Sequence, residues 1–275
     1  MNFRSFVSSS GLRDVPLSLG GVVIGVLLAA ADYHVDVCAV LFLLLTVILI
    51  CMLSYAGRQH GNKPVIWKRI LILLTVCAGL LTIRFSFGTI FSIESFVLML
   101  IGLFVVRFAM SPAAASGTGA ADEILLVAFS GLVAVFGSYF IVTHSFGTKL
   151  LVLPALSAGL LTASVRNLQN IRDMETEDDA RMTFAVKLGE KGARGYQTLL
   201  IVSGCVAMTV YPFLRISDPW HFMFVIFLPV LLWSAASVWK RSASSLDSSL
   251  LLLRISIPLV CLLFGLGFIM FLILR

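Results

Sequence analysis

Three residues able to bind a metal ion occur at helical spacing beyond the middle of the chain. Asn170, Asp173 and Glu177 follow one another at intervals of three and four residues, so on a continuous helix they share one face about two turns long. Their side chains offer only amide and carboxylate oxygens, the ligands that Mg²⁺ prefers, and protein-bound Mg²⁺ commonly bridges to phosphates. Arg166 and Arg172 are close in sequence and suit phosphate oxygens. The pattern favours a site for a metal-bound diphosphate.

The same stretch is the most acidic part of the chain. It contains six of the fourteen carboxylates: Asp173, Glu175, Glu177, Asp178, Asp179 and Glu190. A run of charges at a helix end is most often a solvated surface that basic neighbours balance. On these residues alone, a metal-diphosphate site and a solvated helix end both remain open.

Long apolar helices must position this segment. Hydrophobic residues make up 59% of the 275 residues and charged residues 12%, with a mean hydropathy of +1.03, whereas about 25% of the residues of soluble domains are charged. A membrane-spanning helix needs about 20 apolar residues. Such runs predict nine transmembrane helices, near residues 15–33, 37–56, 65–84, 90–108, 122–143, 148–168, 197–215, 219–239 and 250–274. We expect an all-α integral membrane bundle, with one domain over residues 1–275 and long connections at 109–121 and about 166–196.

Basic residues predict how this bundle lies in the membrane. With the N-terminus on the cytoplasmic side, sixteen of the twenty Lys and Arg residues fall on that side, and only Arg84, Lys149, Arg215 and Arg275 fall on the other. Cytoplasmic loops collect Lys and Arg, so this asymmetry favours a cytoplasmic N-terminus in a bacterial-type inner membrane. The basic residues are dispersed over many loops, which argues against binding of nucleic acid.

The acidic segment and its continuation resemble a known motif. Residues 170–177 read NIRDMETE, and residues 183–189 read TFAVKLG. This string resembles the second aspartate-rich motif of the UbiA superfamily of intramembrane prenyltransferases. It is most similar to the MenA branch, which prenylates 1,4-dihydroxy-2-naphthoate in menaquinone biosynthesis. Weaker similarities occur at residues 12–19, which read LRDVPLSL, and at residues 136–140, which read FGSYF and include Tyr139.

The resemblance implies a fold and a reaction. Such proteins have nine helices around a cavity that opens to the membrane. Two acidic motifs at its cytoplasmic mouth hold Mg²⁺ and an isoprenoid diphosphate, and the prenyl group is transferred to an aromatic acceptor. Diphosphate leaves only if its growing negative charge is neutralised, which bound metal ions can do.

The resemblance also suggests roles for particular residues. Asp173, Glu177 and Asn170 would hold Mg²⁺, while Arg172 and Arg181 would meet the diphosphate. In the loop after the second span, Arg58 and His60 are further candidates for contacts to phosphate. Tyr139 lies in a helix whose family counterpart lines the cavity, and its ring is a candidate wall for the prenyl cation.

The first acidic motif of the family has no counterpart here. It would fall near residues 54–61, which read SYAGRQHG, and no Asp or Glu occurs between Asp36 and Glu94. In the second motif, Glu177 replaces the usual Asp and Arg181 stands near the usual Lys. Either Arg58 and His60 neutralise the diphosphate in place of one metal, or the chain is a catalytically degenerate member that binds an isoprenoid or quinone or acts as a membrane scaffold. A transporter is disfavoured, because the predicted spans show neither a deeply placed ionisable residue nor a repeat.

Overall fold

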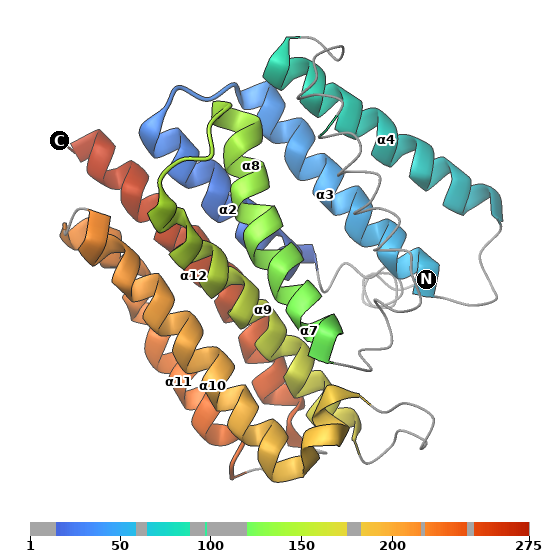
Figure 1. Cartoon of the computed structure of the whole chain (residues 1–275), viewed down its shortest axis with the longest axis vertical. Helices are drawn as coiled ribbons and strands as arrows, with labels where there is room; N and C mark the ends of the chain where they lie inside the picture. The colour runs from blue at the N-terminus through green and yellow to red at the C-terminus, as the bar shows by residue number, and fades with distance from the viewer. Residues whose placement is uncertain are drawn as a thin grey trace.

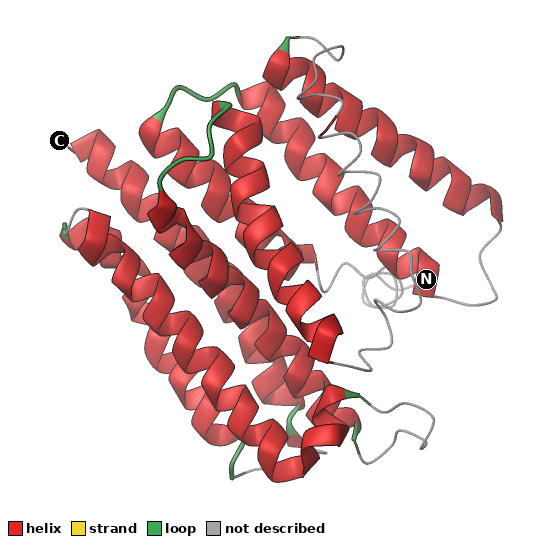
Figure 2. Cartoon of the chain, in the orientation of Figure 1, coloured by secondary structure: helices red, strands yellow, loops and turns green. Residues whose placement is uncertain are grey.

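The computed structural model describes residues 15–58, 65–88, 97, 120–174, 183–215, 218–240 and 245–274. Every regular element in these ranges is a helix (Figure 2). The elements are α2 (Val15–Asp32), α3 (Val37–Arg58), α4 (Val65–Phe87), α7 (Ala120–Val127), η1 (Ala128–Val133), α8 (Ala134–Thr143), η2 (Lys149–Leu151), α9 (Val152–Asp173), α10 (Phe184–Arg215), η3 (Pro219–Phe227), α11 (Leu228–Ser237) and α12 (Asp247–Leu274).

These elements form an integral, multi-pass membrane bundle, as the apolar runs predict. Within the described ranges, eight helical segments are long and apolar enough to cross a bilayer. They coincide with eight of the nine predicted spans. The ninth, predicted at 90–108, lies outside the described residues except for Val97. The all-α class is therefore confirmed.

The helix α9 lies at the centre of the bundle (Figure 1). It packs along α10 and also contacts α7, η1, α2 and α12, while α12 packs on α2 and α3 pairs with α4. As a result, 61% of the span that contains α9 is buried, compared with 17% of the α3 span. The helix that ends at Asp173 is thus held by protein on several sides, whereas α3 is a peripheral helix.

The helices of the bundle begin and end at two opposite ends. At one end, called the Asp173 end, α7 begins, α9 ends and α10 begins. At the other end, called the Asp32 end, α2, α8 and α10 end and the loop from α8 to α9 turns back (Figure 1).

A wide π-helical turn, η1, interrupts the span that runs from α7 to α8. In an uninterrupted α-helix, Glu123 of α7 and Tyr139 of α8 would point about 160° apart, at about 100° per residue. Both side chains are nevertheless buried, at 3% exposure each. Each residue of a π-turn advances the helix by a smaller angle, so η1 rotates α8 relative to α7 and brings both residues toward the protein interior.

Glycines allow this span to approach α9 very closely. A Cβ atom on Gly159 of α9 would lie 2.5 Å from the carbonyl oxygen of Val127, and one on Gly131 of η1 would meet the carbonyl oxygen of Ala155. Small residues at helix contacts are the usual device for close packing of transmembrane helices. Backbone contact therefore fixes the π-turn against α9.

A buried amide pair joins α9 to α10. Asn167 donates its two amide hydrogens to the carbonyl oxygen of Ala193, at 3.1 Å, and to Oε1 of Gln197, at 2.8 Å. Asn167 and Gln197 are at most 1% exposed. Polar groups buried in this way are strongly unfavourable unless they are paired, so the two helices are held in one register.

The boundaries of α9 and α10 correct the predicted connection at 166–196. The helix α9 continues to Asp173, and α10 begins at Phe184, well before the predicted span at 197–215. The early part of α10 carries several charged side chains, which hydropathy does not recognise as part of a span. At Gly189, φ is +69°, and this left-handed residue separates a short first turn from the long helix that follows.

We predict that Gly159→Ala destabilises the bundle. The added methyl would force Val127, at the end of α7, away from α9, and overpacking of this kind costs about 1–3 kcal/mol. Thermal unfolding of the protein in detergent should therefore begin at a lower temperature. Gly137→Ala is the matched control, because a Cβ at that helical position meets nothing within 4 Å. An equal loss of stability in both variants would contradict the close packing described here.

We also predict that Asn167→Ala lowers the free energy of unfolding by about 1–3 kcal/mol, because it leaves two buried oxygens without their donor. Chemical denaturation in detergent, followed by tryptophan fluorescence, measures the change. Gln169→Ala, a half-buried amide on the same helix, is the control and should change stability less. If the control is the more damaging variant, the Asn167 pairing contributes little.

Candidate active site

The last turns of α9 carry the residues with which the sequence analysis began. Asn170, Arg172 and Asp173 are all helical, and Met174 follows as the C-cap. Asn170 and Asp173 are therefore one turn apart on one face of the helix, as predicted. The Asp173 side chain is 40% exposed, whereas Nδ2 of Asn170 is buried and has no hydrogen-bond partner among the described residues. The face thus offers an accessible carboxylate next to a buried amide donor.

Arg172 binds the carboxylate of its neighbour through two hydrogen bonds. Its Nε donates to Oδ1 of Asp173 at 2.6 Å, and its second terminal nitrogen donates to Oδ2 at 3.1 Å. The other terminal nitrogen donates to Oδ1 of Asp247, at the start of α12, at 3.0 Å. The predicted diphosphate-binding cation and the predicted metal ligand therefore neutralise each other. Both are about one third or more exposed, so solvent and ligands compete for this pair.

Four predicted site residues fall where side chains are not described. Glu177, Arg181 and His60 lie outside the described residues, and Arg58 is the last residue of α3, with its side chain outside the description. In Figure 1, α3 ends on the side of the bundle where α7 begins. The roles of all four residues stay predictions.

Tyr139 lies at the opposite end from Asp173. It is near the end of α8, is 3% exposed, and donates its hydroxyl hydrogen to Oδ2 of Asp32 at 3.1 Å. Arg215, at the end of α10, binds Oδ1 of Asp32 and also donates to the hydroxyl of Tyr211 at 2.7 Å. This network joins α2, α8 and α10. Tyr139 is consequently separated from the predicted metal ligands by most of the length of α9.

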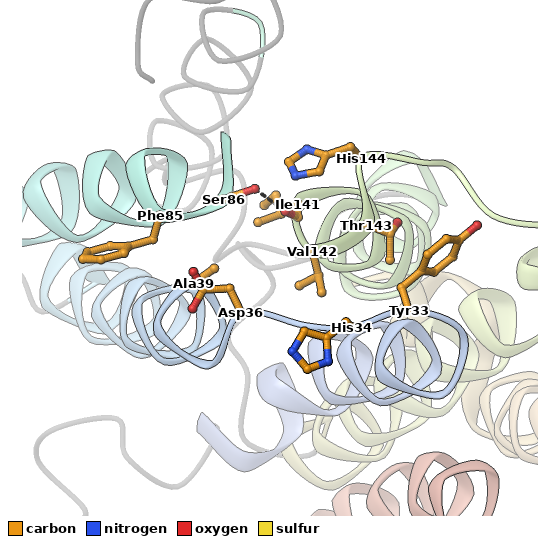
Figure 3. Close-up of a pocket in the computed structure, with 10 residues that line it drawn as sticks. All are labelled: Tyr33, His34, Asp36, Ala39, Phe85, Ser86, Ile141, Val142, Thr143 and His144. Atoms are coloured by element: carbon orange, nitrogen blue, oxygen red, sulfur yellow. Dashed lines mark hydrogen bonds between the residues drawn. The ribbon is translucent and has the colours of Figure 1, made fainter. Parts of the chain in front are cut away.

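A pocket also opens at the Asp32 end (Figure 3). Its volume is about 320 Å³, and its polar lining comes from the ends of α2, α4 and α8 and the loop before α3: Tyr33, His34, Asp36, Ser86, Thr143 and His144. None of the predicted metal or diphosphate ligands lines it. This pocket is therefore separate from the site at the end of α9.

Glu123, in the first turn of α7, was not among the predicted site residues. Its side chain is buried, and its Oε1 lies 4.0 Å from Nε of Arg166 on α9. Neither carboxylate oxygen has a hydrogen-bond partner among the described residues. A single acid at the start of an apolar span carries no spacing pattern, so only the fold places it beside Arg166, one turn of α9 before Asn170.

The described residues contain no group of three or more His, Cys, Asp and Glu side chains able to hold a metal ion. The donors that do lie at the end of α9, the amide oxygen of Asn170 and the carboxylate of Asp173, are of the hard type that suits Mg²⁺. They fit a partial ligand set, to which residues 175–182 would have to add.

Comparisons with known proteins agree with this architecture. The chain is 25% identical over 268 residues to the 1,4-dihydroxy-2-naphthoate octaprenyltransferase of Escherichia coli, covering 86% of each chain. It is 27% identical over 221 residues to the enzyme of the same name from Haemophilus influenzae, covering 77% of this chain and 70% of that one. A solved structure from work on digeranylgeranylglyceryl phosphate synthase in membranes has the same fold, with a TM-score of 0.63 over 98% of this chain and all of that chain, at 16% identity.

The family model for UbiA prenyltransferases matches residues 64–257, which is more than half of the chain. The matched region includes the whole of α9 with Asn170 and Asp173, and the relatives align well beyond it. The chain therefore belongs to the UbiA prenyltransferase family.

Proposed function

We propose that the protein transfers a polyprenyl group from an isoprenoid diphosphate to an aromatic acceptor, most simply 1,4-dihydroxy-2-naphthoate, as a step of menaquinone biosynthesis. The observation that carries the proposal is the oxygen-bearing face of α9, where Asn170 and Asp173 lie beside Arg172 within the region matched by the family model. The names of the two bacterial relatives supply the acceptor.

Asp173, Asn170 and Glu177 would hold Mg²⁺ at this face. The ion would supply positive charge to the diphosphate as the bond to the prenyl carbon breaks. The chain itself fixes the carboxylate at the end of a helix that is buried along its other faces, so its position changes little on binding.

Arg172 serves as the internal counterion of Asp173 before substrate arrives. When a cation occupies the Asp173 carboxylate, the guanidinium is released and can turn to the diphosphate oxygens, which it matches in geometry. One terminal nitrogen of the guanidinium also binds Asp247 at the start of α12, so Arg172 keeps a second carboxylate partner during this exchange. Before substrate binds, the positive charge of Arg172 and the negative charge of Asp173 are thus each paired at the site.

The remaining proposed contacts to the diphosphate come from Arg58, His60 and Arg181. Because residues 37–93 contain no carboxylate, the side chains of Arg58 and His60 would contact the diphosphate where other members of the family use their first acidic motif. The site would lie on the cytoplasmic side of a bacterial inner membrane, with the N-terminus on the same side, as the asymmetry of Lys and Arg favours.

A second candidate function is binding without turnover. The lack of any Asp or Glu between Asp36 and Glu94 favours it, because removal of groups that stabilise a leaving anion slows such reactions severely. In this case the protein would bind an isoprenoid diphosphate or a quinone, or act as a scaffold for another membrane enzyme.

Turnover of purified protein with Mg²⁺, an isotopically labelled isoprenoid diphosphate and 1,4-dihydroxy-2-naphthoate tests the proposal. We expect a prenylated naphthoate product, and we expect Asp173→Asn to lower kcat/KM by about 100-fold or more, because it removes a charged ligand at the leaving group. Product formation is measured by chromatography of the labelled lipid fraction.

Asp36→Asn is the matched control, since it neutralises a carboxylate at the Asp32 end while an amide can still cap the backbone N–H of Cys38. It should leave turnover unchanged. Wild-type protein that binds the diphosphate yet forms no product would favour the second candidate function.

Metal removal provides an independent prediction. Treatment with EDTA should abolish turnover, and added Mg²⁺ should restore it, because without a metal ion the carboxylate of Asp173 adds negative charge beside the diphosphate instead of balancing it. The same titration with Asp173→Asn should need a higher Mg²⁺ concentration for half-maximal rate. Full activity in EDTA would instead support neutralisation by the basic residues alone.

A further inference from the structure

Glu123 is a buried carboxylate that accepts no hydrogen bond from the described residues. Its residue exposure is 3%, and both carboxylate oxygens lack a hydrogen-bond donor among the described residues. Burial of a carboxylate is strongly unfavourable unless it is both paired with a charge and hydrogen-bonded. Among the described residues, Glu123 has one distant opposite charge and no hydrogen bond.

Arg166 supplies the opposite charge. Its Nε lies 4.0 Å from Oε1 of Glu123, which is within the range of an ion pair but beyond that of a hydrogen bond. Glu123 also interacts electrostatically with Asp122, the preceding residue, and with Tyr196 of α10. Since Arg166 already supplies an opposite charge, what the carboxylate still lacks is a hydrogen bond, which a neutral donor can provide.

The position of Glu123 relates it to the site at the end of α9. Arg166 and Asp173 are separated by about 10 Å along the helix axis, at 1.5 Å per residue. Asn170 lies between them, and its Nδ2 is a second buried polar atom without a partner among the described residues. Two polar groups without a hydrogen-bond partner among the described residues therefore lie on the side of α9 that leads toward Asp173.

We infer that Glu123 binds the aromatic acceptor, by accepting a hydrogen bond from one of its ring hydroxyl groups, while the amide of Asn170 donates to a neighbouring oxygen. This inference rests on the proposed function. A hydroxyl is the neutral donor that the carboxylate lacks, and a hydrogen bond from it to a carboxylate raises the electron density of the ring. The acceptor would then lie beside the first turn of α7 and the last turns of α9, away from the close contact at Val127, with its reacting carbon toward the diphosphate at Asp173.

The π-turn supports this assignment through geometry. Glu123 points toward α9 in a span whose other half is rotated by η1, and π-turns occur frequently at functional sites. The close contact of Gly131 and Gly159 holds that rotation in place. The carboxylate is therefore positioned by backbone packing and does not depend on a flexible loop.

The test compares wild type, Glu123→Gln and Glu123→Ala as full-length protein in detergent, with separate saturation curves for 1,4-dihydroxy-2-naphthoate and for the isoprenoid diphosphate. We expect Glu123→Ala to raise KM for the naphthoate about 10- to 100-fold, the range for a lost hydrogen bond to a charged group. The KM for the diphosphate should stay within about twofold. Glu123→Gln keeps an acceptor oxygen and should lie between the two.

Asp122→Asn is the matched control, because it neutralises the adjacent carboxylate, which is less buried than Glu123. It should leave both saturation curves unchanged. Thermal unfolding of each variant identifies those that remain folded, and Glu123→Gln, which preserves shape, supports the comparison if Glu123→Ala does not fold.

Equilibrium dialysis of the naphthoate against the same proteins separates this inference from the proposed function. If wild type shows no turnover but binds the naphthoate, and Glu123→Gln weakens that binding, the inference holds and the proposed reaction fails. If wild type turns over and folded Glu123 variants keep the wild-type KM for the naphthoate, the carboxylate is only a structural partner of Arg166 and the inference is overturned. Absence of naphthoate binding by wild type overturns both.

Discussion

The close approach of η1 to α9 determines much of the described architecture. Gly159 and Gly131 let two backbones meet where any side chain would hold them apart, and the buried amide of Asn167, two turns further along α9, then fixes this helix against α10. Neither contact depends on the hydrophobic effect, which offers little selectivity between helices in lipid. The central helix is therefore positioned by shape and by hydrogen bonds, and the groups at its end take their place from it.

The two ends of the bundle use charge differently. At the Asp32 end, Asp32, Arg215 and two tyrosines form a connected network in which the polar groups pair with one another across three helices. At the Asp173 end, the pairing is partial: Arg172 is shared between two carboxylates, and Glu123 and Asn170 keep polar atoms without a hydrogen-bond partner in the described part of the chain. The first arrangement suits a structural closure, and the second suits exchange with ligands.

Features with a local cause were predictable from the sequence. Hydropathy located eight described spans, and the spacing of Asn170 and Asp173 predicted their common face because both depend only on neighbouring residues. The early start of α10 was not predictable in this way, since its charged first turns hide a helix and Gly189 interrupts it. The partner of Tyr139 was also hidden, because Asp32 lies 107 residues away. No spacing pattern in the sequence marks Glu123 as a site residue, and only the fold shows that it packs beside Arg166.

The wide turn at Ala128–Val133 has a consequence for how this membrane span can diverge among relatives. The π-turn offsets the rotation of α8 relative to α7. The buried positions of the two halves therefore need not follow one continuous 3.6-residue repeat. Substitutions can therefore accumulate in the α7 half without disturbing the network of Asp32, Tyr139 and Arg215 at the other end of the span. In a regular helix, any rotation of one half about the helix axis would also rotate the other half, across the whole membrane.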